Sequence, residues 1–120
     1  MLSVYCADSL VKTVAAGISA PVQKNICIKG LVGSQDAIIL SSVFSIHPQD
    51  SVVILHDREE AGYFQNDLQN LLGREILLFP MSYKRPYEFE ETENANILMR
   101  AEVLNRLANK TSPEIIVTYP

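Results

Sequence analysis

The sequence predicts an α/β fold, an open and mostly parallel sheet of four strands flanked by helices. Short β-branched apolar runs alternate along the chain with longer segments of helical spacing. Such alternation, with strands that are apolar throughout, is typical of a parallel sheet covered by helices. The 120 residues are 48% hydrophobic and 20% charged, which suits one globular domain with a single core. We therefore expect residues 1–120 to form one domain.

The first predicted helix begins after Asp8, a residue type that caps helices by accepting a backbone hydrogen bond. Gly17 and Pro21 end this helix. Its apolar residues follow helical spacing and are Leu10, Val11, Val14, Ala15 and Ile18. A strand is expected over residues 26–29.

The next helix is expected from Ser34 to Ile46, and Pro48 stops it. Because this helix is apolar nearly all round, we expect it to be buried on most sides. Residues 51–56 form a continuous apolar run, which predicts a strand covered on both faces.

A third helix is predicted to start at Asp57, with Glu60 completing a capping box. Gly73 is a suitable C-terminal cap, and strands follow at residues 75–79 and 114–118. The last helix, residues 92–109, has one apolar face, formed by Ile97, Ala101, Leu104 and Ala108. Because the chain stops two residues after the last strand, we expect it to be a fragment of a longer, multidomain protein.

Composition limits the partners and the compartment. The net charge is −4 and the pI is about 5.1, which argues against attraction of nucleic acid by the whole surface but leaves a local patch open. Cys6 and Cys27 have no metal-binding or redox spacing, and Cys27 is expected to be buried in its strand. No signal peptide and no apolar run of about 18 residues is present, so a cytoplasmic location is expected.

Residues 30–37, Gly-Leu-Val-Gly-Ser-Gln-Asp-Ala, lie between a predicted strand and a predicted helix, where a phosphate-binding loop would lie. A working loop reads G-x-x-x-x-G-K-[S/T]. Here Gln35 replaces the second glycine, Asp36 replaces the lysine, and Ala37 replaces the hydroxyl residue that coordinates magnesium. One pair of unit charges at ~4 Å and an effective dielectric of ~20 is worth roughly 4 kcal/mol, so reversing that charge opposes triphosphate binding strongly.

One interpretation is a degenerate phosphate loop of the RecA/P-loop NTPase type, with no catalytic residue, no metal and no cofactor in this chain, and the family resemblance described below favours it. Its residues are Gly30, Gly33, Ser34, Gln35, Asp36 and Ala37. The alternative from spacing alone is a pair of glycines that only turns the chain tightly.

Tyr83, Lys84, Arg85 and Tyr87 place two cations among aromatic side chains, an arrangement that can stack bases and bind phosphates. A DNA or interdomain contact is one interpretation of these residues. The alternative is an ordinary surface loop whose aromatic residues fold back on the core, and the glutamates that follow would oppose a nucleic acid backbone. His47 and His56 lack companion ligands, and Asp57 is better explained as a helix cap than as a catalytic acid.

Several segments together resemble the N-terminal, UvrB-like module of bacterial transcription-repair coupling factors. The loop with its lysine lost looks like that of the excision-repair protein UvrB. The block Phe-Pro-(five residues)-Pro-Tyr-Glu resembles the coupling factors' aromatic segment, although their usual tryptophan is absent. The matching segments, within residues 24–120, are residues 29–37, 52–57, 78–88, 100–107 and 115–118.

The resemblance implies a fold of the UvrB domain 1a type and a scaffold or interaction role in transcription-coupled nucleotide excision repair in the bacterial cytoplasm. Full coupling factors contact UvrA, RNA polymerase and double-stranded DNA, and carry their ATP- and magnesium-dependent translocase motor elsewhere. This chain would then be a non-enzymatic part that packs against other domains of its own protein. The alternatives are a divergent ATPase or helicase domain that still binds ATP, and a stand-alone flavodoxin-like binding domain.

Overall fold

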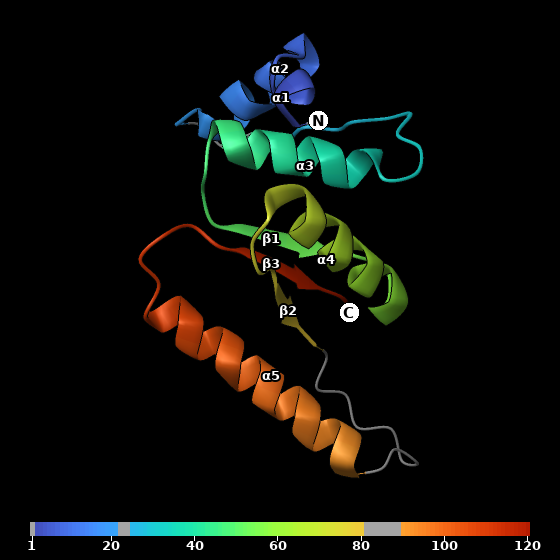
Figure 1. Cartoon of the computed structure of the whole chain (residues 1–120), viewed down its shortest axis with the longest axis vertical. Helices are drawn as coiled ribbons and strands as arrows, with labels where there is room; N and C mark the ends of the chain where they lie inside the picture. Colours follow the sequence, from blue (N-terminus) through green and yellow to red (C-terminus); the bar gives the residue numbers. More distant parts are fainter. Residues whose placement is uncertain (1, 22–24, 81–89) are drawn as a thin grey trace. The chain divides into compact units, whose positions relative to one another are not determined.

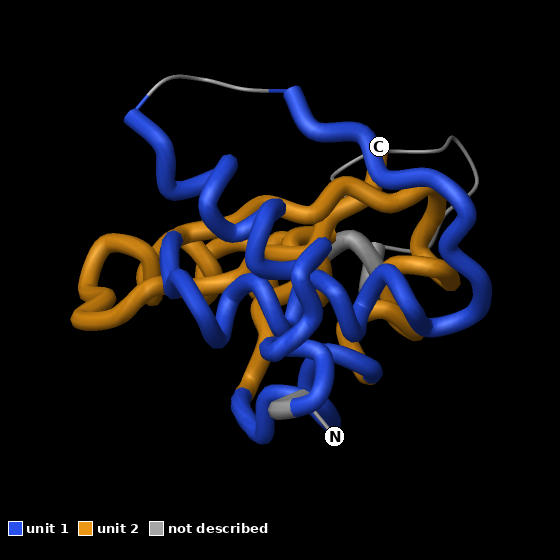
Figure 2. Tube along the Cα trace, turned by 90° about the horizontal axis from the view of Figure 1, so that it is seen from above, with its two compact units in different colours: residues 1–49, 67–74 blue, residues 50–66, 75–120 orange. Residues whose placement is uncertain are grey.

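The computed structural model describes residues 2–21, 25–80 and 90–120. It is a small α/β structure with a parallel three-stranded sheet and flanking helices (Figure 1). The chain divides into two compact units (Figure 2). Unit 1 comprises Met1–Gln49 and Asp67–Arg74, and unit 2 comprises Asp50–Asn66 and Glu75–Pro120.

Unit 1 is built on three helices, α1 (Leu2–Cys6), α2 (Ser9–Ser19) and α3 (Gln35–Ile46). The predicted cap of α2 is confirmed, because Asp8 Oδ1 accepts a hydrogen bond from the Leu10 N–H at 2.8 Å. The Cys6 thiol lies 3.7 Å from the Ser42 carbonyl and links α1 to α3. A small core joins α2 to α3 through Val11, Ala15 and Val43, with Val14 and Ile39 packed against it.

Unit 2 contains the sheet, made of β1 (Ser51–Ile54), β2 (Leu77–Phe79) and β3 (Ile115–Thr118) in the order β1-β3-β2. All neighbouring strands are parallel, as predicted. The central strand β3 carries the core of the sheet, since Ile115 and Val117 have no exposed surface. Asp50 strengthens the start of the sheet by accepting the Glu114 N–H at 3.0 Å and by pairing with Lys110.

Helix α4 (Arg58–Leu72) begins in unit 2 and ends in unit 1. Its predicted caps, Asp57 and Gly73, are confirmed, but Glu60 reaches back to the N–H of His56 rather than to that of Asp57 as a capping box would. The Glu60 N–H donates to Asp57 Oδ1 at 2.8 Å, and the Glu60 carboxylate accepts from the His56 N–H at 3.1 Å. Gly73 ends the helix with a φ of +64°, a conformation that glycine adopts without strain.

Helix α5 (Glu90–Ala108) packs against β2. Its Arg100 guanidinium lies 4.2 Å from the centroid of the Phe79 ring and donates to the Pro80 carbonyl at 2.9 Å. Arg106 pairs with Glu75, before β2, at 2.7 Å. That hydrogen bond and the negative charge of Glu75 raise the pKa of Arg106, which keeps the guanidinium charged at every ordinary pH.

Replacing Arg100 with alanine should destabilise unit 2 by about 1–2 kcal/mol, because a cation–π contact and a charged hydrogen bond are lost together. Thermal unfolding followed by circular dichroism measures this effect. Arg100→Lys keeps the charge but not the planar guanidinium, so we expect it to recover only part of the loss. An Arg100→Ala variant as stable as the parent would contradict this assignment.

The first predicted strand, residues 26–29, is not a strand in this structure. Residues 25–32 have neither helix nor strand structure. Within the described chain, the only backbone hydrogen bonds of this segment join Val32 to Gln35. A strand needs a hydrogen-bonded neighbour, and residues 26–29 have none here. The prediction that Cys27 is buried is also wrong, since this side chain is exposed.

One predicted burial pattern is wrong in unit 2. Strand β1 is covered on one face only, with Val52 64% and Ile54 70% exposed. Val52 shares its register position with Ile116 and Leu77, yet Leu77 is buried, because α5 packs over β2 and β1 lies at the opposite edge. The predicted apolar face of the last helix is exposed as well, at Ile97, Ala101, Leu104 and Ala108. The face that packs instead contains Val103, which is 4% exposed.

Candidate functional site

The predicted phosphate loop leads into α3, and both of its glycines have a backbone conformation that other residues rarely adopt. Gly30 has a φ of +81° and Gly33 a φ of +62°, both in the left-handed region that favours this residue. Gln35, which stands where the working motif has a second glycine, is instead the first residue of α3. The loop thus turns tightly and leads directly into α3.

In working phosphate loops, backbone N–H groups of the loop bind the phosphate. Here two such N–H groups donate to side chains of the loop itself. The Val32 N–H donates to Gln35 Oε1 at 2.8 Å, and the Ala37 N–H donates to Asp36 Oδ1 at 2.7 Å. A helix N-terminus favours negative charge because its first N–H groups lack intrahelical partners. In this chain Asp36 supplies that charge from within the first turn of α3.

A second carboxylate lies beside the loop. The Ser34 hydroxyl hydrogen-bonds to Asp67 Oδ2 on α4 at 3.3 Å, and Ser34 makes no capping hydrogen bond to α3. Asp36 and Asp67 therefore both place negative charge near the turn, and a polyphosphate would meet repulsion from each. Sequence reasoning missed Asp67, because no local pattern connects it to a loop 33 residues earlier.

Ala37, the position of the lost hydroxyl, is fully buried. A hydroxyl residue here would lie inside the fold rather than at a surface where a metal ion could reach it. The candidate loop therefore has Asp36 at the position of the motif's lysine, has the second carboxylate of Asp67 beside it, and presents no group at the position that normally holds magnesium.

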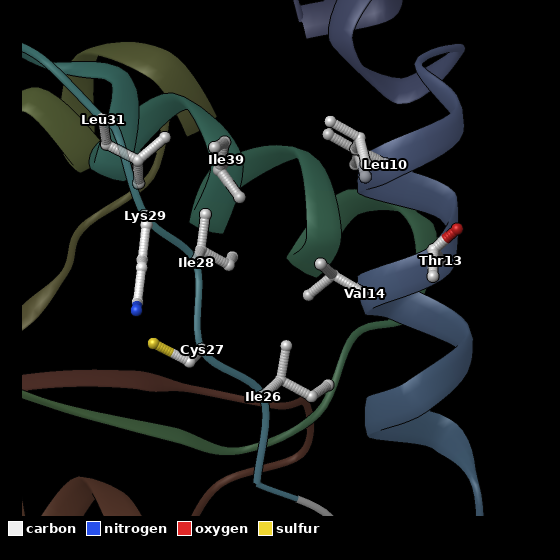
Figure 3. Close-up of a pocket in the computed structure, with 10 residues that line it drawn as sticks. Leu10, Thr13, Val14, Ile26, Cys27, Ile28, Lys29, Leu31 and Ile39 are labelled. Carbon is white, nitrogen blue, oxygen red and sulfur yellow. The ribbon is translucent and has the colours of Figure 1, made fainter.

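An apolar cavity of about 350 Å³ lies next to the loop, between α2, residues 26–31 and α3. Most of its lining is aliphatic and comes from Leu10, Val14, Ile26, Ile28, Leu31 and Ile39. Figure 3 shows Ile26 and Ile28 pointing toward α2, while Cys27 and Lys29 project from the other side of the same segment. The polar residues among those that line the cavity are Thr13, Cys27 and Lys29.

Of the other predicted positions, those that the structure describes do not add to this site. Tyr83, Lys84, Arg85 and Tyr87 lie outside the described residues. His56 is exposed after β1, His47 is half-buried after α3, and Asp57 serves as a helix cap. Over residues 2–21, 25–80 and 90–120, no group of three or more His, Cys, Asp or Glu side chains could hold a metal ion.

Comparison with protein-family models, with curated proteins and with solved structures gives no match for this chain. Within the described part of the chain, no helix combines the length and apolar character needed to cross a membrane.

Proposed function

We propose that this chain is a non-catalytic, UvrB-like module of a transcription-repair coupling factor, with a degenerate ATP site. It would act as a scaffold and interaction module in transcription-coupled nucleotide excision repair. The observation that carries the proposal is that side chains of the loop bind its own backbone. Gln35 accepts a hydrogen bond from the Val32 N–H, and Asp36 accepts one from the Ala37 N–H. Such a loop keeps the turn of a nucleotide-binding fold without its phosphate chemistry.

The complete fold that goes with this function is RecA-like, with residues 26–29 as a fourth strand. Two observations support this part of the proposal. Ile26 and Ile28 point to one side and Cys27 and Lys29 to the other (Figure 3), which is the alternation of a strand. The backbone of these residues also makes no hydrogen bond within the described chain, so its donors and acceptors are available for a ladder.

The partners follow from the resemblance alone. Other domains of the same protein would pack on this module, and the complete coupling factor would engage UvrA, RNA polymerase and double-stranded DNA in the bacterial cytoplasm. ATP and magnesium would belong to a motor elsewhere in that protein. Exposed apolar residues such as Val52 and Ile54 support an interaction role, because clustered apolar surface commonly marks contact sites.

Isothermal titration with Mg-ATP tests the proposal directly. We expect no binding to the native chain, and micromolar affinity would overturn the proposal. A Gln35→Gly/Asp36→Lys variant should gain measurable affinity for tripolyphosphate, because it frees two N–H groups and replaces a repelling charge with an attracting one. Ala37 is left unchanged because it is fully buried.

The matched control is Asp36→Asn, which removes the charge and keeps an oxygen that can accept the Ala37 N–H. We expect this variant to bind no nucleotide. If Asp36→Asn bound as well as the double variant, charge alone would exclude phosphate and the hydrogen bonds within the loop would have no part in it.

A further inference from the structure

Helix α5 presents an apolar row to solvent, beside the face that packs on the sheet. Ile97 is 50% and Leu104 59% exposed, and Ala101 and Ala108 are exposed between and after them. The intervals of four, three and four residues are those of a coiled-coil seam. The row spans about 16 Å along the helix at 1.5 Å per residue. We call these four residues the α5 seam.

The packed face of α5 is a different one. Val103 is buried and Arg100 lies over the Phe79 ring. Since α5 already has its contact with β2 through these residues, the α5 seam is an additional apolar surface. Leu98, 71% exposed, extends it on the flank away from Arg100.

Large and small residues along the α5 seam change places when the order is reversed, because Ile, Ala, Leu, Ala becomes Ala, Leu, Ala, Ile. When two such helices lie antiparallel about a twofold axis between residues 102 and 103, Ile97 faces Ala108 of the partner subunit and Ala101 faces the partner's Leu104. Every layer then contains one large and one small side chain. Packed surfaces are most stable when volumes match in this way.

We propose that a second copy of this chain docks on the α5 seam and forms a twofold, antiparallel helix pair. A twofold interface uses the same patch on both subunits and therefore requires a self-complementary pattern, which the α5 seam has. A different partner would require no such symmetry. This inference is independent of the loop and of its lost nucleotide chemistry.

The dimer is expected to be weak and to respond to salt. A contact of one helix along three turns is smaller than the roughly 1,200–2,000 Å² of a standard stable interface. Each copy carries a net charge of −4, so the two copies repel one another at low ionic strength, and added salt screens this repulsion. Sedimentation equilibrium over a wide concentration range should therefore show reversible dimerisation that strengthens with sodium chloride.

A swap of large and small residues tests the geometry. Ala101→Leu places two leucines opposite each other, and Leu104→Ala places two alanines there, so each change should weaken dimerisation at least about tenfold. The double variant Ala101→Leu/Leu104→Ala restores one large and one small residue per layer and should dimerise nearly as well as the parent. The seam is exposed, so these variants should keep the parent's circular dichroism spectrum.

Ala95→Leu is the matched control, because it makes the same substitution at an exposed position of α5 outside the seam. We expect it to leave dimerisation unchanged. The proposal is overturned if the parent stays monomeric at every concentration, if Ala101→Leu strengthens self-association, or if the double variant fails to recover it.

Discussion

Replacing Ile115 with alanine should lower the free energy of unfolding by about 2–5 kcal/mol, the usual range when a buried isoleucine is truncated. Ile115 has no exposed surface and belongs to the central strand β3, which pairs with β1 on one side and β2 on the other. Truncation removes apolar contacts and leaves a cavity that neighbouring strands cannot easily fill. The melting temperature should fall by roughly 10 °C or more in a domain of this size.

The control for Ile115→Ala is Ile54→Ala, the same substitution on edge strand β1. Ile54 is 70% exposed, so its truncation should cost less than about 0.5 kcal/mol. Urea unfolding followed by circular dichroism measures both variants. Equal losses for the two would mean that Ile54 is covered in solution, and that the exposed face of β1 has a partner that the structure of the single chain does not contain.

Replacing Ser41 with alanine should stabilise the chain by about 1–3 kcal/mol, opposite in sign to most core substitutions. Ser41 has no exposed surface, and its hydroxyl has no hydrogen-bond partner within the described chain. A buried hydroxyl without a partner loses its hydration and gains nothing in exchange. Alanine removes that group and also favours the helical backbone of α3 slightly.

The adjacent Ser42 provides a close control for Ser41→Ala. It is equally buried, but its hydroxyl donates to the Ile38 carbonyl at 2.8 Å. Ser42→Ala loses that hydrogen bond, so we expect a result between no change and a loss of about 1 kcal/mol. A stabilisation of the same size at both positions would show that helix propensity, rather than the unpartnered hydroxyl, is responsible.

Features encoded by neighbouring residues could be predicted from the sequence. Asp8 and Asp57 cap helices where expected, and Gly73 ends α4 in the left-handed conformation. The positive φ angles of Gly30 and Gly33 likewise follow from a tight turn before a helix. In each case the interaction spans only a few residues, so one local pattern contains both partners.

The candidate site was predictable in part for the same reason. The replacements at Gln35 and Asp36 are visible in the sequence, and their hydrogen bonds to Val32 and Ala37 are local. The second carboxylate was not predictable, because Asp67 reaches Ser34 from a helix far along the chain. Only the tertiary structure brings such groups together.

The sequence by itself determined the caps of α2 and α4, that the sheet is parallel, and which side chains share a face, but it did not predict α1 or the extension of α2 beyond Gly17 to Ser19. Only the tertiary structure decided which of those faces are covered and which strands find a neighbour. Periodicity records which residues point the same way, whereas burial and strand pairing depend on segments distant in the chain. This is why residues 26–29 have the pattern of a strand without a ladder, and why α5 turns Val103 rather than Leu104 toward the fold.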